Sequence, residues 1–211
     1  NPRSTKASMG IYIFTWEKLR KYLIEDENDK NSENDFGKNI IPKMLADGQR
    51  MYAYQFDGYW KDVGTISSLW EANMDVLKGD EFNLDDDKWK IYARNNAEPP
   101  HYVAPTGNVI NCLVSEGTVI NGTVKNSIVS NSVKIGKDAY IEESVIMPGA
   151  VIEDGADVRY SIVGWNAVVG KNSMVGETLE HCNPGEWKIS VIAPNYTLAP
   201  NSVVGANEMI G

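Results

Sequence analysis

One stretch of the sequence decides the fold of the larger part of the chain. It covers residues 129–175 and reads VSNSVKIGKDAYIEESVIMPGAVIEDGADVRYSIVGWNAVVGKNSMV. Branched aliphatic side chains recur in it at intervals of six, six and five residues, over and over. The positions are Val129, Ile135, Ile141, Ile146, Ile152, Val158, Val163, Val169 and Val175. Three short steps therefore make one turn, and this period predicts a three-walled parallel β-helix filled by aliphatic side chains.

Small residues mark one corner of this predicted column. Each stands four positions after an aliphatic residue, where two walls converge and only a small side chain fits. These pairs are Ile135 and Ala139, Ile152 and Ala156, and Val169 and Ser173. Such hexapeptide periodicity is typical of the left-handed parallel β-helix. A β-sandwich with accidental spacing would not be expected to keep nine aliphatic residues in register.

A longer repeat gives the length of one coil. Similar ten-residue phrases begin at Asn111, Asn126, Glu143, Tyr160 and Ile189. The successive intervals are 15, 17, 17 and 29 residues, and the last equals 17 plus an insertion of 12. We therefore expect regular coils after a slightly irregular first one, with a loop inserted near residues 177–188.

The first part of the chain mixes helix and strand signals. Ile11–Phe14 and Met51–Phe56 have the composition of short strands, separated by two helical patterns and the polar stretch 25–34, which we expect to be a loop. Pro42 should start or kink the second helix. Thr65 predicts the N-cap of a third helix, which runs through Leu77 and is ended by Gly79. The alternation predicts an α/β layer.

We therefore expect three regions. Residues 1–88 form the α/β part, residues 89–108 a crossover linker, and residues 109–211 the β-helix.

The net charge of −9 at pH 7 argues against nucleic acid and anionic membranes as partners. The sequence contains no apolar run of membrane-spanning length. The two cysteines are too few for a disulfide framework, so we expect free thiols in a cytoplasmic protein.

Short motifs in the first part carry a specific resemblance. In order, they are ASMGIY (7–12), NDFGK (34–38), GYWKDVGT (58–65) and LWEAN (69–73), followed by IYARNNAEPPHYVAPT (91–106). Together with the β-helix, they resemble the sugar nucleotidyltransferases, and among these the bacterial glucose-1-phosphate adenylyltransferase family. The resemblance covers the whole chain and implies the C-terminal portion of such an enzyme, so that the α/β part would be a remnant of its Rossmann-like nucleotidyltransferase domain. The family's nucleotide-binding half, with its glycine-rich loop and catalytic aspartate, would precede it, so we expect these 211 residues alone to be inactive.

The resemblance also implies a reaction and a set of site residues. ATP and glucose 1-phosphate would give ADP-glucose and pyrophosphate for glycogen synthesis, with Mg²⁺ bridging the phosphates. Glucose 1-phosphate would be bound by Ser8, Tyr12, Asp35, Phe36, Trp60 and Asp62, and none of these is assigned a catalytic role. Asp62 would also be the metal ligand, since a carboxylate at a strand-to-helix junction suits a hard cation.

Each of these residues also has a structural interpretation. Ser8 could be satisfied by backbone groups, Asp35 could cap a helix, and Asp62 could only order its loop. Tyr12 and Phe36 are as well suited to core packing as to ligand contact, whereas Trp60 offers a flat apolar wall to a sugar.

The same resemblance also implies how the protein assembles and is regulated. It implies a homotetramer, alone or with a paralogous subunit, controlled by anionic metabolites. Arg159 is the one arginine after Val109, which is sparse for a phosphate effector site. A non-catalytic regulatory paralogue and a transferase for another sugar 1-phosphate remain open. A different class is a hexapeptide acyltransferase that uses His181 as base. The structural interpretation, a histidine in a polar surface loop, is the one we favour for His181.

Overall fold

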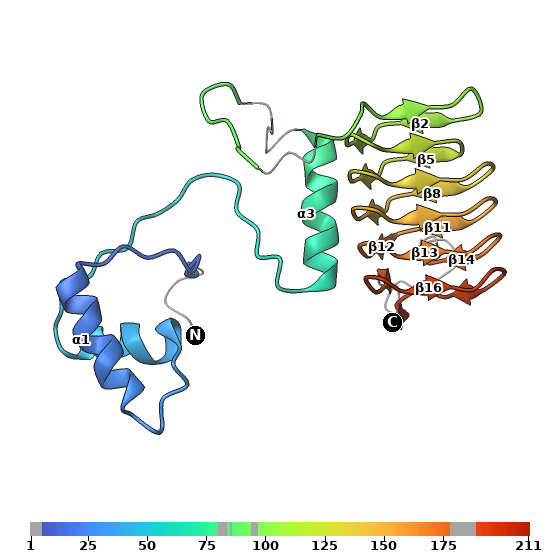
Figure 1. Ribbon diagram of the computed structural model, residues 1–211. Helices are drawn as coiled ribbons and strands as arrows, with labels where there is room; N and C mark the ends of the chain where they lie inside the picture. Colours follow the sequence, from blue (N-terminus) through green and yellow to red (C-terminus); the bar gives the residue numbers. More distant parts are fainter. Residues whose placement is uncertain (1–5, 80–83, 85, 94–96, 178–188) are drawn as a thin grey trace. The chain divides into compact units, whose positions relative to one another are not determined.

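A computed structural model describes residues 6–79, 84, 86–93, 97–177 and 189–211 of the chain (Figure 1). The chain divides into two compact units, Asn1–Trp60 and Lys61–Gly211. No helix in the described ranges combines the length and the apolar composition that a membrane span requires.

The unit Lys61–Gly211 is built on a parallel β-helix whose short strands stack coil upon coil (Figure 1). Three six-stranded sheets, here named A, B and C, form its walls. Sheet A contains β1 (Tyr102–Val103), β4 (Val119–Ile120), β7 (Lys134–Ile135), β10 (Val151–Ile152), β13 (Val168–Val169) and β16 (Thr197–Leu198). Sheet B contains β2 (Asn108–Ile110), β5 (Thr123–Lys125), β8 (Tyr140–Glu142), β11 (Asp157–Arg159), β14 (Met174–Val175) and β17 (Val203–Val204). Sheet C contains β3 (Leu113–Val114), β6 (Ile128–Val129), β9 (Val145–Ile146), β12 (Ser161–Val163), β15 (Ser190–Ile192) and β18 (Met209–Ile210).

The strand register confirms the predicted coil lengths. In sheet A, Val119 lies opposite Lys134, 15 residues later, and Val151 lies opposite Val168, 17 residues later. Val168 in turn pairs with Thr197, 29 residues later, because the insertion falls between them. Residues 178–188 of that insertion, with His181 and Cys182, lie outside the described residues. The first coil begins at Tyr102, ahead of the boundary predicted at residue 109.

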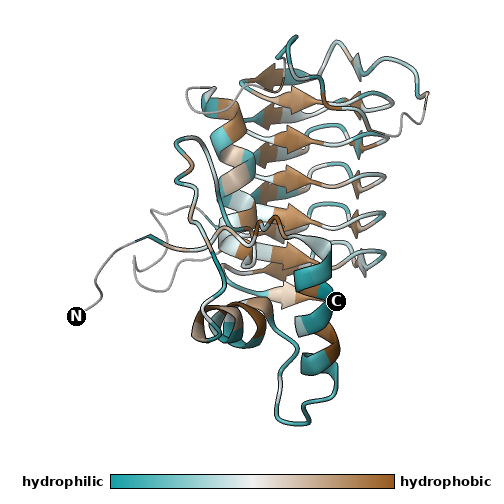
Figure 2. Ribbon diagram, turned by 90° about the vertical axis from the view of Figure 1, so that its left-hand side faces the viewer, coloured by the Kyte–Doolittle hydropathy of each residue, from teal (hydrophilic) through white to brown (hydrophobic). Residues whose placement is uncertain are grey.

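The interior of the β-helix is the predicted aliphatic column. All nine aliphatic residues of the repeat are at most 1% exposed, and they belong to one continuous core. The small corner residues Ala139, Ala156 and Ser173 are at most 2% exposed. Figure 2 shows the same separation, with hydrophobic strands and mostly hydrophilic turns. Burying each large aliphatic side chain contributes roughly 1.5–3 kcal/mol, so the column is the main source of stability.

The corners of the β-helix hold residues in the left-handed backbone region. At the corner that precedes sheet C, Asn111, Asn126, Glu143 and Tyr160 have φ between 44° and 51°. Asparagine is favoured there because its short amide tolerates this conformation. The Nδ2 of Asn111 donates to Oδ1 of Asn126 at 2.9 Å, which ties two successive coils together. The repeat of aliphatic residues had not predicted this feature.

Helix α3 (Ile66–Lys78) runs alongside the stacked coils and covers sheet C (Figure 1). Its predicted ends are confirmed. Thr65 Oγ1 accepts the backbone N–H of Ser68 at 3.1 Å, and Gly79 closes the helix with φ of 71°. Met74 packs with Val145, Ile162 and Ile189 of the β-helix unit, so α3 belongs to the same hydrophobic structure as the coils.

The unit Asn1–Trp60 contains helices around a small core of its own. These are α1 (Trp16–Glu27), the π-helix η1 (Phe36–Ile40) and α2 (Ile41–Ala46), which follows η1 without a break. Pro42 lies in the first turn of α2, where the π-helix η1 gives way to the α-helix, so it starts that helix as the sequence predicted. Tyr22, Ile40 and Met44 are buried in this core.

The two strands predicted in this unit are wrong. Residues 11–14 and 51–56 are not strands, and Ile13 and Tyr52 are 99% and 90% exposed. A strand exists only through hydrogen bonds to a neighbouring strand, and the described residues of this unit offer none. The loop predicted at 25–34 also begins too early, because α1 continues to Glu27. Ion pairs of Glu25 with Lys21 and Lys43, at 3.7 and 2.9 Å, favour that extra turn.

Candidate functional site

Three of the predicted site residues form one cluster in the unit Asn1–Trp60. The hydroxyl oxygens of Ser8 and Tyr12 lie 2.9 Å apart and share a hydrogen bond. The Tyr12 ring stacks on Phe36, with centroids 5.8 Å apart and planes at 19°. Phe14 contacts both rings, at centroid distances of 5.9 Å and 5.8 Å. Phe14 and Phe36 also pack on the buried core of this unit, so the core holds the cluster in place.

The hydroxyls of this cluster are exposed. Ser8 Oγ accepts the N–H of Gly10 at 3.2 Å, and Gly10 turns the chain with φ of 71°. This contact is the backbone satisfaction that the structural interpretation of Ser8 required. Tyr12 is 37% exposed, because only one face of its ring is stacked. Two neighbouring hydroxyls beside an aromatic surface can donate to, or accept from, the oxygens of a sugar phosphate.

Asp35 joins this cluster through its neighbour Phe36 and acts as a helix cap. It is the N-cap of η1, and its Oδ1 accepts the backbone N–H of Lys38 at 2.8 Å. Its own backbone N–H donates to Oδ1 of Asn39 at 3.2 Å. The structure therefore bears out the capping interpretation. The residue is exposed, so its carboxylate also faces solvent next to the stacked rings.

The other two predicted residues lie outside the stacked rings. Trp60 is the last residue of the first unit and is 44% exposed. Asp62 belongs to the other unit, the one that contains the β-helix. Its Oδ1 accepts the N–H of Gly64 at 3.0 Å, so its carboxylate does order the loop before α3. Asp62 is exposed, which leaves the carboxylate open to a ligand.

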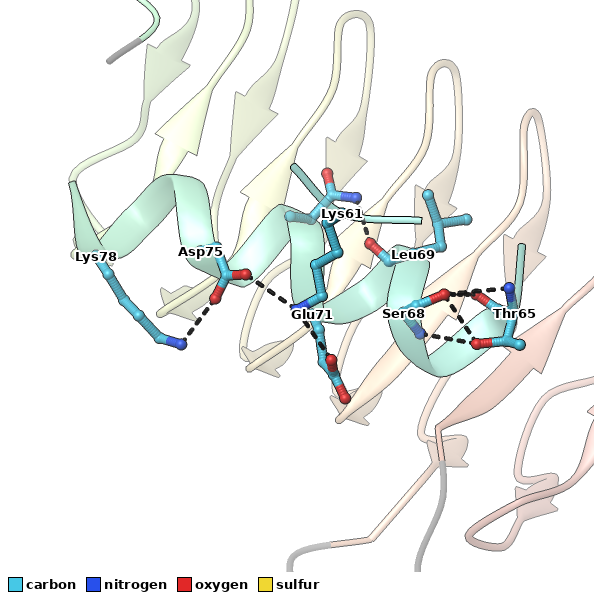
Figure 3. A network of polar contacts seen from close by, with 8 residues as sticks. Lys61, Thr65, Ser68, Leu69, Glu71, Asp75 and Lys78 are labelled. Atoms are coloured by element: carbon cyan, nitrogen blue, oxygen red, sulfur yellow. Dashed lines mark hydrogen bonds and ion pairs between the residues drawn. The ribbon is translucent and has the colours of Figure 1, made fainter. Parts of the chain in front are cut away.

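Lys61, next to Asp62, lies at the centre of a polar network on α3 (Figure 3). Its Nζ lies 2.9 Å from Oε2 of Glu71 and 3.0 Å from Oδ2 of Asp75. Lys78 approaches the other oxygen of Asp75, also at 2.9 Å. Glu71 and, after it, Asp75 raise the pKa of Lys61, while partial burial opposes the rise. The sequence motifs gave no role to Lys61. The signal that could have found it is the pair Glu71 and Asp75, because two carboxylates four residues apart lie on one face of a helix and favour a basic partner between them.

Few side chains in the described part of the chain are placed to bind a metal ion together. Among the described residues, no group of three or more histidine, cysteine, aspartate or glutamate side chains could hold an ion. Mg²⁺ is commonly bound by one or two carboxylates, with substrate phosphates and waters as its other ligands. A single exposed carboxylate such as Asp62 fits that kind of coordination. His181, the base of the acyltransferase alternative, lies outside the residues that the structure describes.

The basic residues of sheet B, Lys125 and Arg159, lie beside the acidic residues Glu142 and Asp157. We call this charge-balanced row of residues the sheet B ladder. Arg159 donates to both carboxylate oxygens of Asp157, at 2.7 and 2.9 Å, and lies 3.9 Å from Glu142. Arg159 and Lys125 also lie over the ring of Tyr140, at 4.7 and 5.2 Å from its centroid. Asp157 is the main cause of the raised pKa of Arg159. Because two carboxylates already hold this guanidinium, the ladder is poorly suited to bind an anion.

Comparisons with known proteins agree with this organisation. Residues 1–79 match the nucleotidyl transferase family model, and residues 101–191 match the model of the GlmU-like C-terminal hexapeptide. The chain is 48% identical to the glucose-1-phosphate adenylyltransferase of Acetivibrio thermocellus, over its whole length and 51% of that protein. The enzyme of the same name from Clostridium beijerinckii is 52% identical over the whole chain and 53% of that protein. For Clostridium perfringens the values are 47% identity, the whole chain and 50% of the protein.

The chain thus spans about half the length of the curated relatives it matches. The matches to these relatives include both parts of the chain, the helical unit and the β-helix. The resemblance expected from the motifs is confirmed, and this chain is a homologue of the bacterial glucose-1-phosphate adenylyltransferases along its whole length.

Proposed function

We propose that the chain is part of an enzyme that joins ATP and glucose 1-phosphate to give ADP-glucose and pyrophosphate, and so supplies glycogen synthesis. The observation that carries this proposal is the roughly 50% identity, over the whole chain, to proteins named for that activity. The cluster of Ser8, Tyr12 and Phe36 supports it, because these are the positions where the motifs predicted sugar-phosphate contacts.

The proposed chemistry demands positioning more than covalent participation. A phosphate oxygen of glucose 1-phosphate attacks the α-phosphorus of ATP, and the bond from that phosphorus to the departing pyrophosphate breaks. Two anionic substrates must therefore be held close together and in line. In this proposal, the hydroxyls of Ser8 and Tyr12 bind oxygens of glucose 1-phosphate, and Asp35 accepts a sugar hydroxyl. Phe36 supports the Tyr12 ring, and Trp60 offers its exposed indole as an apolar wall.

Asp62 is the proposed protein ligand for Mg²⁺. The bound ion would screen the phosphate charges and polarise the reacting phosphoryl group. The exposed carboxylate, with one oxygen held by the Gly64 N–H, supports this assignment. We further propose that the protein works in the cytoplasm as a homotetramer, alone or with a paralogous subunit.

The test is an assay of the complete natural protein that contains this chain. ADP-glucose and pyrophosphate are measured with ATP, glucose 1-phosphate and Mg²⁺. Asp62→Asn should lower kcat/KM about a hundredfold, the usual scale for a displaced or missing positioning group. Asp138→Asn is the matched control: it changes an exposed carboxylate in the same unit, at a corner whose φ of 58° asparagine accepts, and should leave kcat/KM unchanged.

Other outcomes would redirect the assignment. Formation of a different nucleotide sugar, with ADP-glucose absent, would favour a transferase for another substrate pair. Absence of turnover with every nucleotide and sugar phosphate would favour the regulatory paralogue. Equal activity of Asp62→Asn and the wild-type protein would remove Asp62 from the site.

A further inference from the structure

Lys61, the neighbour of Asp62, ties the start of its loop to helix α3. Its ammonium group lies between Glu71 and Asp75, one turn apart on α3 (Figure 3). The side chain of Lys61 is only 25% exposed, in contrast to 68% for Lys78 on the other side of Asp75. Lys61 is therefore held by two carboxylates in a partly buried position, whereas Lys78 approaches Asp75 from a more exposed one.

The helix that holds Lys61 is itself fixed on the β-helix. Trp70 Nε1 donates to the backbone carbonyl oxygen of Glu143 at 2.7 Å, and the Trp70 ring lies 6.1 Å from that of Tyr160. Met74 is buried against Val145 and Ile162 of sheet C. Because Trp70 lies one residue before Glu71, these contacts fix the face of α3 from which Glu71 and Asp75 reach Lys61.

The loop between Lys61 and α3 has two fixed ends. The clamp on Lys61 holds the first end, and the capping box of Thr65 and Ser68 holds the second. Only Asp62, Val63 and Gly64 lie between them, and the Asp62 carboxylate accepts the Gly64 N–H within that span. A side chain on so short a loop can move little while both ends stay in place.

We infer that Lys61, clamped by Glu71 and Asp75, is a positioning residue that fixes the Asp62 carboxylate for the reaction proposed above. This inference rests on the proposed function, since the role of Asp62 is part of it. Lys61 acts through its neighbour and need not touch substrate. The β-helix contributes to the same task, because α3 carries the acidic half of the clamp and lies on sheet C.

A positioning role and a purely structural role predict different effects on protein stability and on the reaction rate. Partly exposed ion pairs contribute little to stability, so breaking the clamp should not unfold the protein. A displacement of about 1 Å at a reacting group, in contrast, can lower a rate up to a hundredfold. The clamp should therefore matter more for catalysis than for the midpoint of thermal unfolding.

The experiment uses the complete natural protein and three variants: Lys61→Met, Lys61→Arg and Lys78→Met. Methionine keeps the aliphatic stem and removes the charge, and arginine restores the charge. Lys78→Met is the matched control, because it removes a partner of the same Asp75 without touching the loop of Asp62. We expect Lys61→Met to lower kcat/KM for glucose 1-phosphate about tenfold, Lys61→Arg to recover most of it, and Lys78→Met to change nothing.

A second readout does not depend on activity. Hydrogen exchange of the segment around Gly64 should be about fivefold faster in Lys61→Met than in the wild-type protein or Lys78→Met, the scale of one weak ion pair.

Equal exchange and equal kinetics in Lys61→Met and Lys78→Met would overturn the inference. If the wild-type protein makes no ADP-glucose, the proposed function fails, while the exchange comparison still decides whether Lys61 orders the loop. A large loss of thermal stability in Lys61→Met would assign it a structural role instead.

Discussion

Trp70 and Glu143 are 73 residues apart in sequence and joined by a hydrogen bond of 2.7 Å, from the indole Nε1 to the backbone carbonyl oxygen. Glu143 is at a corner of the β-helix with φ of 48°, and its carbonyl group points toward α3. The same indole ring packs at a tilt against Tyr160, one coil further on. One side chain of α3 therefore contacts two successive coils.

Trp70→Phe should destabilise the β-helix unit while leaving its hydrophobic core intact. Phenylalanine keeps most of the apolar contact with Tyr160 but cannot donate to the Glu143 carbonyl group. We expect a loss of about 1–2 kcal/mol in the free energy of unfolding, the cost of leaving a shielded acceptor unpaired. Urea unfolding followed by circular dichroism measures it. Ser67→Ala, on an exposed position of the same helix, should change stability by less than about 0.5 kcal/mol, and an equal loss there would contradict this account.

The interior column makes a second prediction on strand β10. Ile152 is fully buried, whereas its neighbour Val151 points out of sheet A and is half-buried. Ile152→Ala should lower the free energy of unfolding by about 2–5 kcal/mol, because it leaves a cavity between coils above and below. Val151→Ala removes less buried surface and should cost clearly less. Similar losses for the two variants would mean that the column is not the source of stability.

The β-helix could be predicted from sequence because its evidence is repeated. Each coil presents the same spacing of aliphatic residues, so the five-and-six-residue period outweighs any single irregular position. Ile135, Ile152 and Val169 also pair with one another in adjacent coils, so one local rule gives the register of a whole sheet. The left-handed corners were less visible, although asparagine at 111, 126, 166 and 172 carried the signal.

The first unit could be predicted only in part. The helix marked by Pro42 and the cap formed by Asp35 depend on residues close in sequence, and both were confirmed. The strands at 11–14 and 51–56 depend on partners far away in sequence, and the described residues of the unit supply none. The candidate site shows the same limit. Motifs named Ser8, Tyr12 and Phe36, but their hydrogen bond and stacking needed the structure, as did the pairing of Lys61 with Asp75.

Glu143 gives the protein a specific pH dependence. Partial burial raises its pKa above the ordinary value of 4.5, with a smaller contribution from Glu142, while a hydrogen bond from Asn126 and the charge of Lys78 act in the opposite direction. A carboxyl group with a raised pKa in the folded state binds its proton more tightly there. It therefore stabilises the fold below 4.5, and this contribution is lost as the pH rises through the folded-state pKa.

Glu143→Gln tests that sign. The variant cannot ionise, so it should be more stable than the wild-type protein at pH 7 and no more stable below pH 4.5. Free energies of unfolding in urea, measured across this range, give the difference between the two proteins at each pH. Glutamine keeps the side-chain length and tolerates the corner about as well as glutamate does. A difference that does not vary with pH, or that grows toward acid, would contradict the burial argument.

Asp35 allows the capping role to be separated from the proposed sugar contact. Asp35→Ala removes the acceptor for the Lys38 N–H and should cost about 1 kcal/mol of stability, whereas Asp35→Ser restores a capping oxygen and should recover most of it. If the carboxylate also accepts a sugar hydroxyl, both variants should raise KM for glucose 1-phosphate about tenfold, since serine is too short to replace it. Thermal unfolding and steady-state kinetics of the complete natural protein distinguish the two effects. Recovery of both stability and KM in Asp35→Ser would show that Asp35 serves only as a cap and would take it out of the sugar site.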